Sequence, residues 1–424
     1  MKIAHIVATP DGAPWMVALA REQMKLGHDV SVIIPSLAGD IHSTLSGSGI
    51  ATYAAPVSIL SQTNHGSRLW DLVQLVRLLR RLRPDVVHSH IVASVVTARI
   101  ASWLADVPAH FAGNVHPLSL EADLYRHLEV GTAFCDARTI ASCNYTRELY
   151  VQSGLPAEQV EMVCYAVDQS TYDPALADGA AVRRELGFDS ETPVVGKIAY
   201  FYPPTTSRFL PELLRGRGIK GHDVFLRAMP HVLEEVPDAK FVVVGRGWGE
   251  RGQEYEESLK ELARSEGVSH AVVFTGERRD VPSVLAAFDV SVHCSLSDNL
   301  GGTVESLLME KAMVVSDIRG FNDTIVHEET GLVVPKDDPR ALAAAIVRLL
   351  RDRELARRLG RNGRHRMLGG FTLAHNVAGI EALLARTPQR AKNHYRLATT
   401  LARFAAAPFR LMPTFLRAFR SART

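Results

Sequence analysis

The sequence predicts an α/β protein built from two Rossmann-like, doubly wound domains in series. Its 424 residues exceed what one ordinary hydrophobic core accommodates, so two domains are expected. In both halves, short apolar runs with strand character alternate with segments of helical periodicity, which is typical of parallel sheets covered by helices. This alternation of strands and helices is interrupted once, between residues 168 and 192, where polar and turn-forming residues dominate. No segment repeats at the fixed period of a solenoid.

The first half supplies the first domain, predicted over residues 1–170. Its first helix ends at a glycine and its second helix is stopped by Pro84, two residues that commonly end helices. No GxGxxG sequence follows the first strand, so we expect no dinucleotide site there. The predicted strands are 2–9, 29–35, 85–89, 109–115, 138–142 and 160–165, and the predicted helices are 15–26, 68–83, 92–104, 120–133 and 145–153.

The second half supplies the second domain, predicted over residues 193–370. A linker at 171–192 precedes it, with a short helical piece at 182–186. A crossover helix is expected at 371–387, followed by a basic amphipathic helical tail at 388–424. The predicted strands are 193–199, 239–245, 271–275, 289–294, 313–316 and 331–334, and the predicted helices are 222–235, 254–266, 282–287, 303–311, 339–351 and 354–367.

Composition excludes several classes of protein. With 46% apolar and 22% charged residues and a net charge of +2, the chain has ordinary globular composition. Its four cysteines have neither metal-binding spacing nor the pattern of a secreted disulfide framework. The amino terminus is typical of a first strand rather than a signal peptide, and no uncharged run reaches the ~18 residues of a membrane span. We therefore expect a cytoplasmic protein.

The stretch SDNLGG at 297–302 predicts a ligand site. It lies between a strand and a helix, at the carboxyl end of the strand, where open α/β sheets bind ligands. Gly301 and Gly302 permit close backbone approach, and the amides of the following helix start suit a phosphate. Asp298 and Glu305 add acceptors for hydroxyl groups, so the loop suits a nucleotide-sugar. The plainer alternative is a turn followed by acids that are favourable near a helix start.

Several short motifs, taken in their order along the chain, resemble those of a known protein family. The second half contains VGK at 195–197, IKG at 219–221, VVG at 243–245, FTG at 274–276 and then SDNLGGTVESL at 297–307. This order is similar to the donor-binding half of retaining GT-B glycosyltransferases of family 4. GHDV at 27–30, PDVVH at 84–88 and GLVVP at 331–335 also resemble that family, so the likeness spans about residues 1–370.

The resemblance implies two domains that face a cleft. The first binds the acceptor and the second binds a nucleotide-sugar, whose sugar is transferred to a glycan or lipid-linked acceptor with retention of configuration. Lys197 and Lys220 are expected to bind the diphosphate, with Arg217 as a further candidate. The insert at 202–216 is expected to form a flap over the diphosphate. The remaining donor-binding residues implied are Gly301, Gly302, Thr303 and Glu305.

The family's paired acids imply two further roles. Glu305 is expected to bind the donor ribose, and Asp298 is expected to contact or stabilise the sugar. Asp298 stands seven residues before Glu305, closer than the usual spacing of the pair, and its side chain is one methylene shorter than the usual Glu. On the acceptor side, His116 is expected to face the reactive end of the sugar, with Gly12 and Glu121 nearby. For Glu121, a helix-start role is an equal alternative.

We expect neither a metal nor a cofactor. The sequence contains no Asp-x-Asp motif, so basic side chains and amides should neutralise the diphosphate. His88 and His90 have the spacing of a metal-binding pair, but no third ligand at suitable spacing accompanies them in the sequence. We therefore expect a structural or cleft-lining role for both.

The carboxyl-terminal tail predicts contact with a membrane. Residues 388–424 contain eight Lys or Arg and no Asp or Glu, beside an apolar face, as in helices that bind anionic lipid at the inner face of the plasma membrane. A second basic patch lies at 77–83. No RNA-binding motif accompanies this charge, so nucleic acid is not expected. Two alternatives stay open: a nucleotide-sugar epimerase on the same fold, and a catalytically silent partner protein that docks on the membrane.

Overall fold

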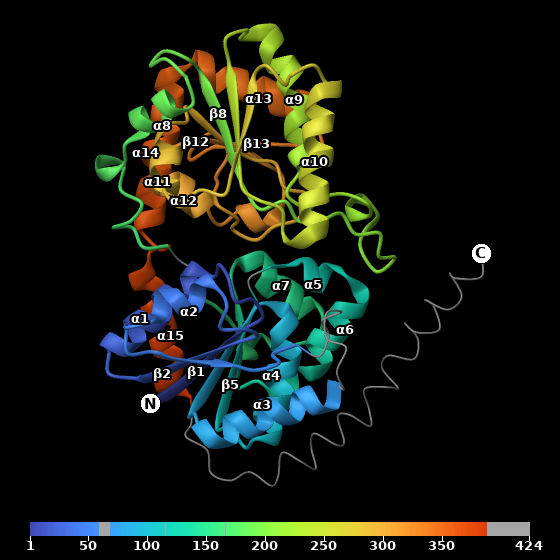
Figure 1. Cartoon of the computed structure of the whole chain (residues 1–424), viewed down its shortest axis with the longest axis vertical. Helices are drawn as coiled ribbons and strands as arrows, with labels where there is room; N and C mark the ends of the chain where they lie inside the picture. The colour runs from blue at the N-terminus through green and yellow to red at the C-terminus, as the bar shows by residue number, and fades with distance from the viewer. Residues whose placement is uncertain (59–67, 115, 166, 388–424) are drawn as a thin grey trace, which may run out of the picture.

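The computed structural model describes residues 1–58, 68–114, 116–165 and 167–387, and the tail predicted at 388–424 lies outside them. Two α/β domains are stacked along the long axis of the molecule (Figure 1). Each has a fully parallel sheet with helices on both faces, which confirms the predicted fold class. Within the described residues, no helix combines the length and apolar character that crossing a bilayer requires.

The first domain contains a seven-stranded sheet in the order β3-β2-β1-β4-β5-β6-β7. Neither α2 (Asp40–Leu45) nor β3 (Ala51–Ala54) was predicted, because both are short and lack a clear apolar period. The other strands are β1 (Lys2–Val7), β2 (Asp29–Ile34), β4 (Val86–His90), β5 (Ala109–Asn114), β6 (Arg138–Ala141) and β7 (Val160–Met162).

Four of the five helices predicted in the first domain are present within one residue of their expected bounds. The predicted helix at 120–133 is wrong: it divides into α5 (Leu118–Glu121) and α6 (Asp123–Thr132) at Ala122. Ala122 has an extended backbone and is fully buried in a cluster that includes Leu210 of the second domain. Tertiary packing therefore overrides the local helical pattern here. The other helices are α1 (Pro14–Lys25), α3 (Arg68–Leu82), α4 (Val92–Leu104) and α7 (Asn144–Gln152).

The second domain contains a six-stranded sheet in the order β10-β9-β8-β11-β12-β13. Its central strands are buried on both faces, as the continuous apolar runs predict. The strands are β8 (Val194–Ile198), β9 (Lys240–Val244), β10 (Val272–Gly276), β11 (Val290–His293), β12 (Ala312–Ser316) and β13 (Leu332–Val334).

Helices α9 (His222–Glu235) and α13 (Pro339–Arg351) begin and end where predicted, whereas α12 (Thr303–Leu308) is shorter than expected. The chain turns at Glu310, whose φ of +55° is incompatible with helix continuation. The other helices are α8 (Gly179–Glu185), α10 (Gly249–Ser265), α11 (Val281–Ala286) and α14 (Arg353–Leu368).

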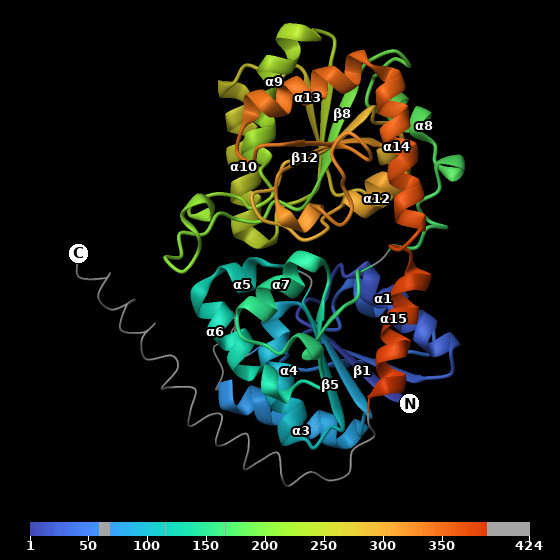
Figure 2. The ribbon, with the colours of Figure 1, turned by 180° about the vertical axis from the view of Figure 1, so that it is seen from behind.

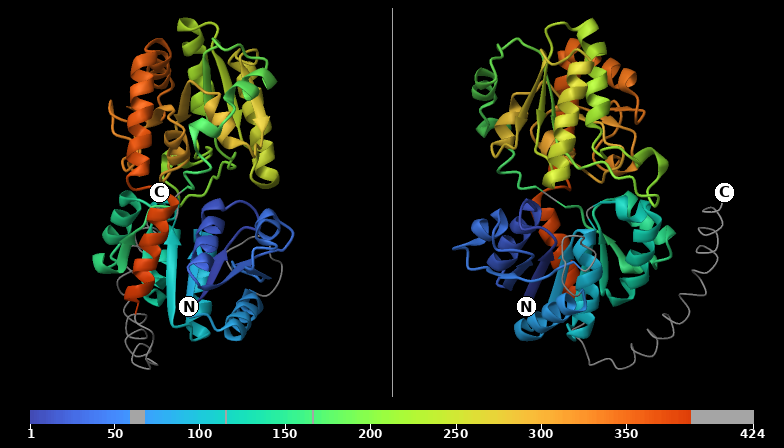
Figure 3. Two further views of the ribbon diagram at one scale, coloured as in Figure 1. Left: turned by 90° about the vertical axis from the view of Figure 1, so that its left-hand side faces the viewer. Right: turned by 45° about the vertical axis from the view of Figure 1, so that its right-hand side comes forward.

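After α14 the described chain returns to the first domain. Helix α15 (Leu373–Arg386) leaves the second domain after α14 and lies along the first domain beside α1 (Figures 2 and 3). Ile380, Leu383 and Leu384 are buried in one cluster with Ile3 and Leu19. The first domain is therefore completed by residues that follow the second domain in the sequence.

Candidate functional site

A cavity of about 920 Å³ lies between the two domains. It is lined by residues that follow strands of both sheets, so the carboxyl ends of the two sheets face each other across it. In each sheet the strand order reverses at the centre, between β1 and β4 and between β8 and β11. Such switch points are where open α/β sheets bind ligands. The lining residues after central strands include Gly12, Ile91, His116, Ala199, Gly245 and Asp298.

A buried ion pair occupies the second-domain side of this cavity. The Lys220 ammonium donates to Asp298 Oδ2 at 2.6 Å, and the same oxygen accepts from Ser295 Oγ at 3.0 Å. Asp298 is only 2% exposed. Burial alone would raise the pKa of Asp298, but Lys220 and then His116 lower it to about 2. Asp298 is therefore a stable carboxylate at neutral pH.

The turn before α9 fixes the position of Lys220. Gly221 has a φ of +63°, and a Cβ there would lie 2.0 Å from the carbonyl oxygen of Cys294, at the end of β11. Leu296 N also donates to the carbonyl of Ile219 at 2.8 Å. Only glycine permits this close approach, which holds Lys220 against the loop that carries Asp298.

Glu305 supplies a second acid to the cavity, from the first turn of α12. Its Oε2 is buried and has no hydrogen-bond partner among the described residues. Burial, together with the nearby charge of Asp298, raises the pKa of Glu305 to about 7. A buried carboxylate oxygen without a donor is costly, so this atom is ready to accept a hydrogen bond from a ligand.

The glycine pair is required by the loop itself. Gly301 has a φ of +54°, and a Cβ at Gly302 would lie 2.8 Å from Cε1 of His293. Two of the amides in this stretch are bonded within the protein. Gly301 N donates to Asn299 Oδ1 at 3.1 Å, and Thr303 N donates to the carbonyl of Leu300 at 3.3 Å.

Four of the predicted residues lie outside the cavity lining, and three of them are bound to other protein groups. Arg217 is bound by Asp223 and Asp337, with contacts of 2.6 Å to each. The Thr303 hydroxyl contacts Thr324 in the core at 2.9 Å. Glu121 accepts from Tyr145 and Ser297, at 3.0 and 2.6 Å, and so joins the two domains. These side chains are occupied by protein contacts that sequence spacing does not reveal.

Lys197 lies beneath the site rather than in its wall. It is fully buried, and Nζ has no hydrogen-bond partner among the described residues. Burial lowers the pKa of Lys197, while the adjacent Cys294 thiol acts in the opposite direction. Its charge is therefore close to the site, but its side chain does not line the cavity.

The acceptor-side candidates His116 and Gly12 both line the cavity. His116 Nε2 lies 3.7 Å from Asp298 Oδ1, across the cleft, and His116 Nδ1 accepts from Leu118 N at 3.1 Å. Burial lowers the pKa of His116 to about 4, and the carboxylate of Asp298 opposes this shift. At neutral pH the ring is therefore neutral and able to exchange hydrogen bonds with a ligand.

The insert at 202–216 is a bridge between the domains. Asp123 N donates to the carbonyl of Phe209 at 3.2 Å, and Leu210 packs in the cluster that contains Ala122. Thr205, Ser207 and Leu210 line the cavity. The insert therefore closes one end of the cavity against α5 and α6.

Aromatic residues in the cavity wall were missed by the sequence analysis. Tyr200 and Tyr202 follow β8, Tyr165 follows β7, and Trp15 lies at the start of α1. Tyr202 and Trp248 pack with ring centroids 5.7 Å apart, and Lys220 Nζ lies 5.8 Å from the Tyr202 ring centroid. Their positions directly after strands could have identified these aromatic residues as part of the cavity wall.

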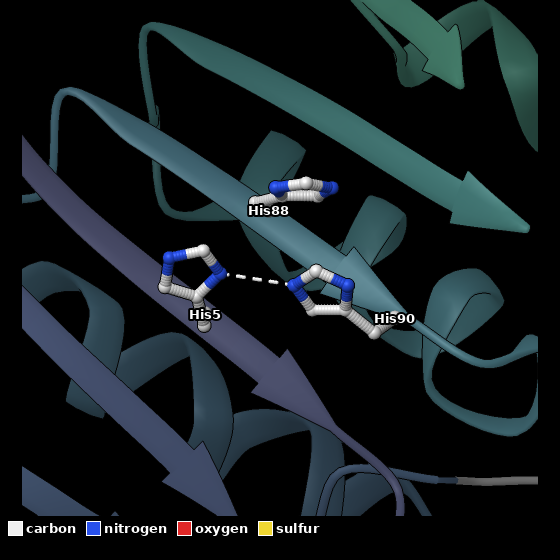
Figure 4. A group of neighbouring side chains, drawn as sticks. All are labelled: His5, His88 and His90. Carbon is white, nitrogen blue, oxygen red and sulfur yellow. Dashed lines mark hydrogen bonds between the residues drawn. The ribbon is translucent and has the colours of Figure 1, made fainter. Parts of the chain in front are cut away.

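His88 and His90 do have a third neighbour, His5, which is supplied by β1. The three side chains form a buried group in the first domain (Figure 4). Since His5 and His88 are 83 positions apart, their spacing along the chain did not indicate that they are neighbours.

Comparison with known proteins identifies both domains. Residues 13–166 match the family model described as "Glycosyl transferase 4-like domain", and residues 204–366 match "Glycosyl transferases group 1". Together these matches cover about three quarters of the chain.

Curated relatives extend this similarity. A UDP-Gal:alpha-D-GlcNAc-diphosphoundecaprenol alpha-1,3-galactosyltransferase from Escherichia coli is 25% identical over 325 residues, covering 74% of this chain and 78% of the relative. A GDP-mannose-dependent alpha-(1-6)-phosphatidylinositol monomannoside mannosyltransferase from Mycobacterium tuberculosis is 28% identical over 257 residues, covering 58% of this chain and 60% of the relative.

A solved structure shares the fold. Anabaena Alr3699/HepE in complex with UDP-glucose superposes with a TM-score of 0.75 at 19% identity, covering 91% of this chain and 99% of that chain. At this identity the likeness concerns the arrangement of the two domains.

Proposed function

Because this chain belongs to the group 1 glycosyltransferases, with a 4-like amino-terminal domain, we propose that its cleft transfers a sugar from a nucleotide-diphosphate donor with retention of configuration. The chain is a glycosyltransferase that uses a nucleotide-sugar donor and a lipid or glycan acceptor. One observation carries the finer proposal: Lys220, Asp298 and Glu305 face one cavity at the switch point of the second sheet.

The donor occupies the second-domain side of the cavity. Lys220 binds the diphosphate, because an ammonium in a partly dry site interacts strongly with developing phosphate charge. Lys197 adds positive charge from beneath the site. Glu305 accepts hydrogen bonds from the ribose hydroxyls through its unpartnered Oε2, since a carboxylate accepts two such bonds readily.

Asp298 and His116 face the sugar at the junction of the domains. The glycosidic bond to the diphosphate breaks and the bond from the acceptor oxygen forms on the same face of the sugar. The acceptor proton passes to the departing phosphate oxygen, so no protein base is needed. Asp298 holds Lys220 in place and stabilises positive charge that develops on the sugar ring, and His116 accepts or donates a hydrogen bond to a sugar hydroxyl. The residues provide the charge neutralisation without a metal ion.

The acceptor is a lipid-linked glycan or a glycan, and the enzyme works at the cytoplasmic face of the membrane. The named relatives act on a diphosphoundecaprenol and a phosphatidylinositol mannoside. In this chain, α3 combines exposed Leu69 and Trp70 with a basic face, and Arg77 lies 5.0 Å from the Trp70 ring centroid. Exposed apolar residues beside arginines suit an anionic bilayer surface, and the basic stretch at 388–424 adds to this attraction.

A transfer assay tests this proposal. The purified chain is incubated with UDP-galactose, UDP-glucose or GDP-mannose and a polyprenyl-diphosphate-linked GlcNAc, and the products are resolved by mass spectrometry. One donor should yield a lipid-linked disaccharide, whose anomeric coupling constant reports retention. Free sugar without acceptor would indicate the epimerase alternative. Donor binding and transfer that are both absent would indicate the silent membrane partner.

A further inference from the structure

Three buried histidines lie on one face of the first sheet, at the carboxyl ends of its two central strands. His5 comes from β1, and His88 and His90 come from β4 (Figure 4). His5 pairs in register with His88, and alternate residues of a strand share a face, so His90 projects to the same side. One nitrogen from each ring lies within 4.8 Å of the other two, and none of the rings is more than 4% exposed.

A chain of hydrogen bonds determines the tautomer of His5. The Glu381 carboxylate on α15 only accepts, so Gln23 Nε2 donates to it at 3.2 Å and Gln23 Oε1 faces His5 Nε2 at 2.8 Å. His5 Nε2 therefore carries the ring proton. His5 Nδ1 consequently presents a lone pair toward His90 Nε2, 2.9 Å away.

His88 lies over this pair with an unused ring nitrogen. Its centroid is 4.1 Å from that of His90 and 5.4 Å from that of His5. His88 Nδ1 is buried and has no hydrogen-bond partner among the described residues. Buried polar atoms are almost always paired. A missing partner at the meeting point of three imidazoles indicates a ligand that the protein atoms do not supply.

We propose that His5, His88 and His90 bind one divalent transition-metal ion, and that Zn²⁺ fits this ligand set best. Imidazole nitrogens suit Zn²⁺, and three of them with one water complete its preferred tetrahedron. Coordination would satisfy His88 Nδ1 and replace the hydrogen bond between His5 and His90, leaving the His90 proton on Nδ1. The Gln23–Glu381 pair is the kind of outer partner that orients a metal-bound histidine.

The surroundings give this ion a structural role. His90 directly precedes Ile91, which lines the cavity and has a φ of +67°, rare for a β-branched residue. The histidines themselves do not line the cavity, so the ion would lie beneath its floor, apart from the groups that bind the donor. Because Glu381 belongs to α15, the ion would also hold this helix against the first domain.

The metal content of the purified chain tests the proposed zinc site directly. The full chain is stripped with a chelator, reloaded with Zn²⁺, passed through a desalting column and analysed by mass spectrometry. We expect one zinc per chain. Loading with Co²⁺ instead should give the visible absorption of a tetrahedral site, which does not depend on activity.

Matched variants locate the ion. His88→Phe keeps the ring volume and should lose both the zinc and the Co²⁺ absorption. Gln23→Leu keeps all three ligands and should weaken zinc affinity by about 10–100-fold. His365→Ala removes an exposed histidine on α14 and should leave both signals unchanged.

Two results would overturn the proposal. One is a wild-type chain that retains no zinc after desalting and gives no Co²⁺ absorption, in which case the three rings are a dry hydrogen-bonded group. The other is equal retention by wild type and His88→Phe, which means that the metal binds elsewhere. If His88→Phe does not fold, the wild-type stoichiometry and the Gln23→Leu affinity still decide the question.

Discussion

The ammonium of Lys220 lies 2.6 Å from Oδ2 of Asp298. The two residues are 78 positions apart, and the approach depends on Gly221, where a side chain would strike the end of β11. Asp298 holds Lys220 at the centre of the cleft. Under our proposal, a bound diphosphate gives Lys220 a second anionic partner without moving it far.

Removing the Lys220 charge should impair catalysis severely. Lys220→Ala is expected to lower kcat by about 10²–10³-fold, the usual effect of losing a group that stabilises transition-state charge. It also leaves Asp298 buried without its main partner. Steady-state kinetics measure the loss. Arg217→Ala is the matched control, because Arg217 is bound by Asp223 and Asp337 outside the cavity, and equal losses in both variants would contradict the assignment.

Nucleotide binding should depend on pH near neutrality. Glu305 has a pKa raised from 4.5 to about 7 by burial, and a carboxylate accepts hydrogen bonds from the ribose hydroxyls better than the protonated acid does. Calorimetric titration with the nucleoside diphosphate should therefore show affinity falling as the pH drops below about 7. Glu305→Gln should show weaker and pH-independent binding.

The same shift predicts the sign of a stability effect. Since the folded pKa of Glu305 lies above its unfolded value, its contribution is most favourable below pH 4.5 and is lost as the pH rises toward 7. Without ligand, Glu305→Gln should thus gain stability relative to wild type between these pH values. Chemical denaturation at several pH values measures it, and a constant difference would contradict the raised pKa.

Loosening the insert should affect transfer more than donor binding. Leu210 is buried beside Ala122 at the contact between insert and first domain, so Leu210→Asp should speed hydrogen exchange at 202–216 and in α5 and α6. We expect a higher KM for the acceptor with little change in nucleotide affinity. Leu176→Asp is the control, because Leu176 is 78% exposed.

The first domain should depend strongly on Arg99. This fully buried guanidinium binds Asp136 at 2.6 Å and Glu129 at 3.1 Å. Removing one partner of a buried charge network costs about 3–5 kcal/mol, so Arg99→Ala should lower unfolding stability by that amount. Arg126→Ala breaks an exposed pair with Asp123 and should cost less than about 1 kcal/mol.

The sequence predicted most elements because apolar periodicity in this chain agrees with its tertiary structure. Helices α4, α9 and α13 follow uninterrupted amphipathic or apolar patterns and have the predicted bounds. The prediction failed at Ala122, where contact with the second domain determines the backbone conformation. It also missed α2 and β3, whose short sequences have no clear apolar period.

The site was also predictable only in part. Strand ends and glycines predicted which loops meet at the cleft, so Lys220, Asp298, Glu305 and His116 line one cavity. The side chains that each residue contacts within the folded protein could not be predicted from the sequence. Arg217 forms ion pairs with two carboxylates. The third histidine, His5, lies on a strand that is distant in the sequence and becomes a neighbour of His88 only in the folded sheet.

The central claim is that the cleft binds a nucleoside diphosphate through Lys220 and Glu305. Thermal unfolding of the wild type with UDP, GDP and ADP, repeated with Lys220→Ala and Glu305→Ala, tests it most directly. At about 100 times its dissociation constant, the correct nucleotide should add roughly 2.7 kcal/mol to wild-type stability. We predict that one nucleotide raises the wild-type midpoint and that both variants lose most of this shift at the same concentration. No shift with any of the three, or equal shifts in the variants, would contradict the account.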